Sequence, residues 1–239
     1  MKKMKKIFSI LFTLCLTFLF TFSGTSVLAK ENATTSNYDN YTPKDYIEWL
    51  ESKSLNDPNS VNILNKFKSL TKQKQEEFIK YLKDPNLLKN MIESINQKEF
   101  NNENTSIKFE NGNAEVNISD KSNTVVPNGR AAVKYHSITR ESESKLLGIA
   151  VVETSHSMNY TSIGSKAGSV TSSSHYVKYN YYPFLTLDWG DTTNATYGSQ
   201  ALSSRPLNYK FNLVGNPTVG TRVFKLWGDI YGGGRLEIE

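Results

Sequence analysis

The chain has 239 residues, of which 28 are Lys or Arg and 23 are Asp or Glu. Four of the basic residues lie among the first 29 residues, which hold no acid, so the chain from Lys30 onward carries 24 basic and 23 acidic side chains. This near-neutral balance, without a long basic run, argues against a nucleic-acid-binding protein. The single cysteine, Cys15, also lies in this N-terminal stretch, which excludes disulfides, thiolate catalysis and cysteine-bound zinc from the remainder.

The N-terminal stretch has the parts of a secretory signal peptide. Four lysines precede an apolar run over residues 7–22, and small side chains follow, with Val27 and Ala29 at the −3 and −1 positions of a cleavage site. We expect residues 1–29 to be removed after Ala29 and the protein to be secreted. The abundance of Asn, Lys, Ser and Thr is typical of Gram-positive secreted proteins.

Residues 30–98 are predicted to form a helical domain of about four helices. Thr42-Pro43-Lys44-Asp45 combines an N-cap, a proline in the first turn and an acid. Asp-Pro-Asn triplets at 57–59 and 84–86 repeat this start signal, and Thr71 is a further cap. Each triplet is expected to place an aspartate on the free amides of a helix start. The spacing indicates helical hairpins packed together, and the domain is a candidate pro-region.

Residues 99–130 are rich in Asn and are predicted to be a linker. They offer at most one weak hairpin, around Asn111-Gly112-Asn113. The stretch ends in Pro127-Asn128-Gly129-Arg130, an exposed turn beside a basic residue, so Arg130 is the candidate processing site.

Residues 131–239 are predicted to form an antiparallel β-sandwich or barrel domain, which gives an α+β fold class for the whole chain. Turn residues at 164–165, 188–191, 198–199, 215–217 and 232–234 separate short runs of strand-forming residues. Strands are expected over 145–153, 176–187, 207–214 and 221–231, with 235–239 paired back on 221–231.

No motif in the β region compels a catalytic mechanism. The three histidines, His136, His156 and His175, lack the close spacing of metal ligands, and no Gly-x-Ser-x-Gly elbow occurs. Glu141, Glu143, Glu153, Asp188, Asp191 and Asp229 are possible partners in a carboxylate pair for glycoside cleavage. We therefore expect no cofactor and no metal, and an enzyme is the less favoured interpretation. The best residues for a hydrolase would be Asp188, Asp191, His156 and His175.

The densest functional signal is aromatic. Residues 175–184 hold five aromatic side chains besides the histidine, and strand alternation puts Tyr176, Tyr182 and Phe184 on one face and Tyr179 and Tyr181 on the other. One face should be core, and the other should expose tyrosine rings that stack on sugars or lie at lipid headgroups. The expected binding face comprises Tyr176, Tyr179, Tyr181, Tyr182, Trp189, Trp227 and Tyr231.

The leading hypothesis is a bacteriocin-like antimicrobial or membrane-active toxin made as a precursor. The helical region would mask the aromatic face, and cleavage after Arg130 would release residues 131–239 with 10 basic and 8 acidic side chains. Its partner would be a bacterial membrane or cell-wall surface, and self-association is possible. The alternative is a non-catalytic module that binds cell-wall glycan or a surface protein, and the third hypothesis is an extracellular hydrolase.

Overall fold

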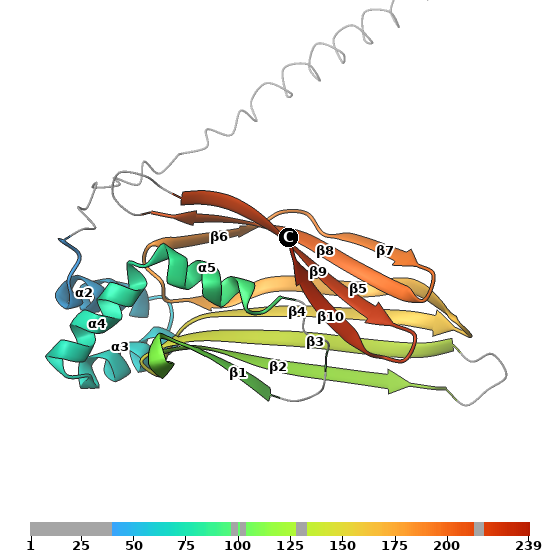
Figure 1. Cartoon of the computed structure of the whole chain (residues 1–239), viewed down its shortest axis with the longest axis horizontal. Helices are drawn as coiled ribbons and strands as arrows, with labels where there is room; N and C mark the ends of the chain where they lie inside the picture. Colours follow the sequence, from blue (N-terminus) through green and yellow to red (C-terminus); the bar gives the residue numbers. More distant parts are fainter. Residues whose placement is uncertain (1–39, 97–99, 101–103, 128–132, 213–217) are drawn as a thin grey trace, which may run out of the picture. The chain divides into compact units, whose positions relative to one another are not determined.

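Short helices begin the described part of the chain in the computed structural model, as Figure 1 shows. The structure describes residues 40–96, 100, 104–127, 133–212 and 218–239. Within these residues the helices are α2 (Pro43–Ser54), α3 (Asn59–Ser69), α4 (Lys72–Leu82) and α5 (Pro85–Glu93).

Local side-chain caps explain where these helices begin. Thr42 caps α2 in a capping box, in which its backbone amide donates to Asp45 Oδ2 at 2.7 Å. Asp84 caps α5 by accepting from the amides of the two residues after Pro85. Asp57 accepts from the amide of Asn59 at 3.0 Å. Both Asp-Pro-Asn triplets therefore place an aspartate on a helix start, which confirms the prediction.

The first sheet contains β1 (Asn104–Phe109), β2 (Ala114–Val125), β3 (Val133–Leu146), β4 (Ile149–Ile163) and β5 (Lys166–Asn180). Its strands lie in chain order, and each pairs antiparallel with the next. The second sheet has the order β10-β9-β8-β6, built from β6 (Leu185–Trp189), β8 (Gln200–Phe211), β9 (Thr218–Asp229) and β10 (Gly234–Ile238). A further strand, β7 (Thr193–Tyr197), pairs with residues 200–204 of β8, while β6 pairs with residues 207–211. A helical bundle followed by an antiparallel sandwich confirms the predicted fold class.

The two sheets share one core with the helices. Phe224, Leu226 and Leu236 are buried from the second sheet, and the buried side chains of α2–α5 belong to the same hydrophobic cluster. The first sheet contributes polar groups as well as apolar ones: β3 buries both Ile138 and Arg140. The described residues all fall in one compact unit, residues 37–239.

Several segment boundaries differ from the sequence expectations. Residues 104–109 and 114–125, part of the expected linker, form the β1–β2 hairpin and extend the first sheet. The strand expected over 145–153 is interrupted by a turn, where Leu147 and Gly148 have positive φ angles of 49° and 77°. The strand expected over 176–187 is broken after Asn180, and β6 begins only at Leu185. The turn expected at 215–217 lies outside the described residues.

Candidate functional site

Helices α2–α5, with the residues up to Asn96, cover an aromatic segment of the β part. We call this helical region the cap, and we call the residues that it covers, Tyr181, Tyr182 and Phe184, the aromatic cluster. All three side chains are at most 3% exposed. They occupy the break between β5 and β6, where Pro183 cannot donate a backbone hydrogen bond to a sheet. The end of one strand and the start of the next thus bring three large rings together.

Tyrosine hydroxyls join the cap to this cluster. Tyr46 on α2 donates to the carbonyl of Tyr181 at 3.0 Å, and Tyr181 donates to Asp57 Oδ2 at 2.9 Å. Tyr182 donates to the carbonyl of Tyr81 on α4 at 3.2 Å. Burial raises the pKa of Tyr46, Tyr181 and Tyr182, and the hydrogen bond to Asp57 adds to the shift at Tyr181. The hydroxyls therefore stay protonated and keep donating.

The solvent side of the cap carries a group of lysines that the sequence interpretation did not single out. Residues 66–83 hold six lysines against two glutamates. Five of these lysines are exposed on α3 and α4 and form what we call the lysine patch: Lys66, Lys68, Lys72, Lys74 and Lys80. This local excess of lysine was visible in the sequence of residues 66–83, but the near-neutral charge of the whole chain gave no sign of it.

The predicted aromatic face is divided between different places in the fold. Tyr176 is 43% exposed on the outer side of the first sheet. Tyr179 lies on the same side, because the β4–β5 register shifts beside Glu153 and leaves Lys178 as an extra residue. Tyr181 and Tyr182 are buried beneath the cap instead of exposed. The seven residues thus do not form one surface.

The three remaining members of the predicted face also lie apart. Trp189 points into the sandwich and packs edge-on against Phe224, at 5.3 Å between ring centroids. Trp227 lies on the outer side of the second sheet, where Arg235 stacks 4.9 Å from its ring centroid. Tyr231 is 81% exposed in the turn between β9 and β10.

Three of the predicted carboxylates meet on the outer side of the first sheet. Lys178 Nζ donates to Glu141 at 2.5 Å and to Glu153 at 2.7 Å, and Tyr179 donates to Glu143 at 2.5 Å. The hydrogen bond from Lys178 lowers the pKa of Glu141. Burial opposes ionisation of Glu143, but hydrogen bonds from Lys145 and Tyr179 outweigh it and lower its pKa. Both carboxylates are thus held ionised, whereas a glycosidase acid needs a raised pKa.

The histidines and the aspartates named for a hydrolase lie in different environments. Asp188 and Asp191 are exposed near the end of β6. His156 and His175 are fully buried between the sheets, where their Nδ1 atoms lie 3.0 Å apart. His175 Nε2 is 2.9 Å from Ser203 Oγ on β8. Burial lowers the pKa of both histidines, that of His175 to about 4, so the pair is neutral and links the two sheets.

Ala29 and Arg130, the two predicted processing positions, lie outside the described residues. The strands around Arg130 nevertheless bear on the predicted release of residues 131–239. All of β2, residues 114–125, pairs with β3. Asp120 on β2 also holds the buried Arg140 on β3 through two hydrogen bonds of 2.6 Å. Release of 131–239 would therefore strip a paired strand from the sheet and leave Arg140 without its carboxylate.

Comparisons with known proteins add no relative. No protein-family model matches the chain, and no match was found among curated proteins or solved structures. Among the described residues, no helix is long and apolar enough to cross a membrane.

Proposed function

We propose that the protein is a secreted, membrane-directed antimicrobial that binds anionic bacterial membranes through the lysine patch and acts when the cap leaves the aromatic cluster. The observation that carries this proposal is the position of the lysine patch on the helices that bury Tyr181, Tyr182 and Phe184. Binding of the cap to a membrane would thus act directly on the cover of the aromatic rings.

Elementary energetics support each half of this proposal. A lysine near an anionic bilayer contributes about 1 kcal/mol of attraction, so several on one surface give strong binding. An aromatic side chain buries about 150–250 Å², so uncovering three would expose more apolar surface than soluble monomers usually tolerate. Tyrosine rings exposed in this way favour the boundary between headgroups and acyl chains. The freed helices would present their own apolar faces beside exposed lysines, as interfacial helices do.

Membrane binding is tested with the chain from Lys30 onward and vesicles of phosphatidylglycerol and phosphatidylcholine. We expect the wild type to bind vesicles that contain phosphatidylglycerol and to release an entrapped dye. A variant with Lys72, Lys74 and Lys80 changed to Gln should bind about 100-fold more weakly, from about 1 kcal/mol per lysine.

A matched variant controls for total charge. Lys108, Lys166 and Lys210 are exposed on the β part, and changing all three to Gln removes the same charge. This control should bind vesicles like the wild type. An equal loss of vesicle affinity in both variants, or no vesicle binding by the wild type, would refute the role of the lysine patch.

Opening of the cap is tested by locking it shut. Asn113 Nδ2 donates to Glu77 Oε1 at 3.0 Å, so these side chains join α4 to the β1–β2 hairpin. The only cysteine is Cys15, so Glu77→Cys with Asn113→Cys gives a unique thiol pair for a short bis-maleimide. The cross-linked protein should bind vesicles but release no dye, while the same variant without cross-linker does both. Full dye release by the cross-linked protein would contradict cap opening.

Binding of a cell-wall glycan is the second candidate function, and it rests on the outer side of the first sheet. A hollow of about 430 Å³ there is lined by residues that include Asn104, Asn117, Glu141 and Glu143, and the exposed ring of Tyr176 lies on the same side. Sugar sites combine such hydrogen-bonding groups with an aromatic ring. We expect the wild type to be retained on cell-wall glycan and the variant Tyr176→Ala to remain unbound. Equal retention of both proteins would exclude this aromatic contact.

A further inference from the structure

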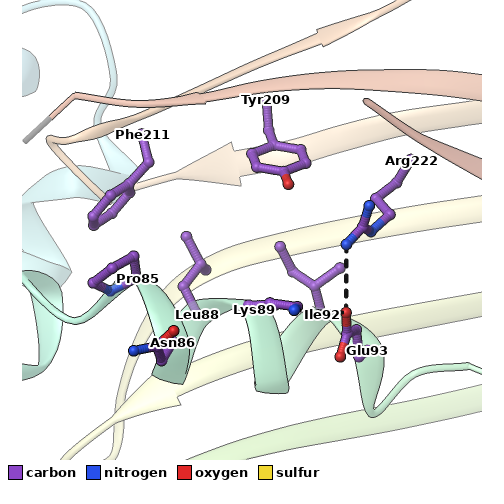
Figure 2. Close-up of a pocket in the computed structure, with 9 residues that line it drawn as sticks. All are labelled: Pro85, Asn86, Leu88, Lys89, Ile92, Glu93, Tyr209, Phe211 and Arg222. Carbon is purple, nitrogen blue, oxygen red and sulfur yellow. Dashed lines mark hydrogen bonds and ion pairs between the residues drawn. The ribbon is translucent and has the colours of Figure 1, made fainter. Parts of the chain in front are cut away.

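A groove of about 160 Å³ separates helix α5 from strands β8 and β9. Figure 2 shows the side chains that line it. Leu88 and Ile92 form its helical wall, and Tyr209 and Phe211 form its strand wall. Arg222 stands at one end, away from Phe211. The groove is thus apolar along most of its length and charged at one end.

The charged end has more positive than negative charge. Arg222 Nη2 contacts Glu93 Oε1 at 3.4 Å, and Lys89 Nζ lies 3.9 Å from the same oxygen. The side chain of Glu93 is 44% exposed and that of Lys89 is 58% exposed. Ion pairs this exposed contribute little stability. The end of the groove therefore offers two cations to one weakly held carboxylate, which suits an added anion.

A glycine sets the position of the ring at the centre of the groove. Gly220 is the cross-strand partner of Tyr209, and a Cβ atom there would clash with the Tyr209 hydroxyl and ring. Because Gly220 has no Cβ, the ring can lie close to β9. The Tyr209 hydroxyl thus lies over Gly220, and Figure 2 shows the ring between Phe211 and Arg222.

We propose that this groove binds an aliphatic carboxylate of about six carbons, with its chain between Leu88, Ile92 and Phe211 and its carboxylate on Arg222. A cavity of about 150 Å³ lined by apolar side chains accepts one benzene molecule, so the observed volume suits a six-carbon chain. A guanidinium binds a carboxylate through two parallel hydrogen bonds, which the single contact to Glu93 does not use. This ligand site is independent of the proposed membrane binding, because the groove takes one small ligand while the cap stays in place.

The test is an NMR titration of the chain from Lys30 onward at pH 7 with the probes butanoate, hexanoate, hexanol and hexylammonium. Hexanoate should shift amide signals of α5, β8 and β9. It should bind about tenfold more tightly than butanoate, because two more methylene groups are buried. Hexylammonium, which has the same chain and the opposite charge, should bind more weakly than hexanol. Shifts confined to other parts of the protein, or equal binding of hexanoate and hexylammonium, would overturn the proposal.

Two variants test the carboxylate contact and the apolar lining of the groove separately. Arg222→Gln should weaken the binding of hexanoate about tenfold and leave the binding of hexanol unchanged, because only the charged hydrogen bonds are lost. Gly220→Ala should displace the Tyr209 ring and weaken the binding of hexanoate and hexanol to the same extent. Unchanged hexanoate binding by Arg222→Gln would refute the assignment of the carboxylate, and unchanged binding of both ligands by Gly220→Ala would refute the assignment of the groove.

Discussion

Replacing Asp120 by leucine should destabilise the protein by about 3–5 kcal/mol, because it leaves the charge of Arg140 unpaired between the sheets. The Arg140 side chain is 0% exposed and that of Asp120 is 3% exposed, and two hydrogen bonds of 2.6 Å join them. Arg140 also donates to the carbonyl of Ile95 at 3.3 Å and lies 4.5 Å from the centroid of the Phe100 ring. A domain is stable by only about 5–15 kcal/mol, so this loss is a large part of the total.

The double variant Asp120→Leu with Arg140→Met should lie within about 2 kcal/mol of the wild type, since it replaces both buried charges by apolar side chains. Urea unfolding followed by tryptophan fluorescence measures all members of this double-mutant cycle. A loss below about 1 kcal/mol for Asp120→Leu would refute the reasoning. Additive effects of the two substitutions would refute it as well, because they would mean that the side chains do not depend on each other.

Three further perturbations test the interior and the cap. The pKa of His175 is lowered from 6.5 to about 4 by burial and then by Arg205, so the folded protein binds fewer protons than the unfolded chain between these values. The free energy of unfolding, measured in urea, should therefore fall by up to about 3 kcal/mol as the pH drops from 6.5 to 4. Tyr181→Phe should lower the free energy of unfolding by about 1 kcal/mol and speed proteolysis of the cap, since the hydrogen bond from the Tyr181 hydroxyl to Asp57 is lost. Gly228→Ala should lower thermal stability by about 1–3 kcal/mol, because the added Cβ would lie 2.5 Å from the Tyr160 ring.

Each of these expectations has a matched control. His175→Gln should remove the part of the pH dependence assigned to His175, and an unchanged slope would contradict that assignment. Tyr231→Phe removes a hydroxyl from a side chain that is 81% exposed and should leave proteolysis of the cap unaltered. Gly228→Ala should lower stability less in a Tyr160→Leu background than in the wild type, and an equal loss in both backgrounds would mean that the clash with the ring is not the cause.

The helix starts were readable from the sequence because their determinants are local. Thr42 and Asp84 cap their helices through amides two or three residues away, so a short stretch of sequence contains both the cap and its partners. The terminal strand was predictable for a similar reason: Gly-rich residues 232–234 turn the chain, and Arg235 pairs with Trp227. In both cases the interacting groups lie close together in the chain.

Strand β3 was missed because its buried face is polar. His136, Arg140 and Ser142 point inward, where apolar residues are expected, and each is satisfied by a residue of another strand. Arg140 needs Asp120 and Ser142 needs Thr154, and a hydropathy pattern records neither partner. Buried polar pairs between strands thus cannot be found by examining one strand at a time.

The aromatic face was assigned incorrectly because strand alternation was assumed to continue from Tyr176 to Leu187. The extra residue Lys178 puts Tyr179 on the same side as Tyr176, and the strand ends before Tyr181. A register shift depends on the neighbouring strand, so the sequence of β5 alone does not specify it. The burial of Tyr181 likewise depends on helices more than 120 residues earlier in the chain.

The long sequence separation of the cap contacts has a consequence for folding kinetics. Strands β1 to β5 pair only with chain neighbours, so that sheet can grow hairpin by hairpin. The cap contacts span far more of the chain: 135 residues separate Tyr46 from Tyr181, and 142 separate Asn96 from Ile238. Closing loops of this length is entropically costly until the strands at their far ends are in place. The helices are synthesised before the segments that carry Tyr181 and Ile238, so we expect each new chain to pass through a stage in which these long-range cap contacts are absent and Tyr181 is uncovered.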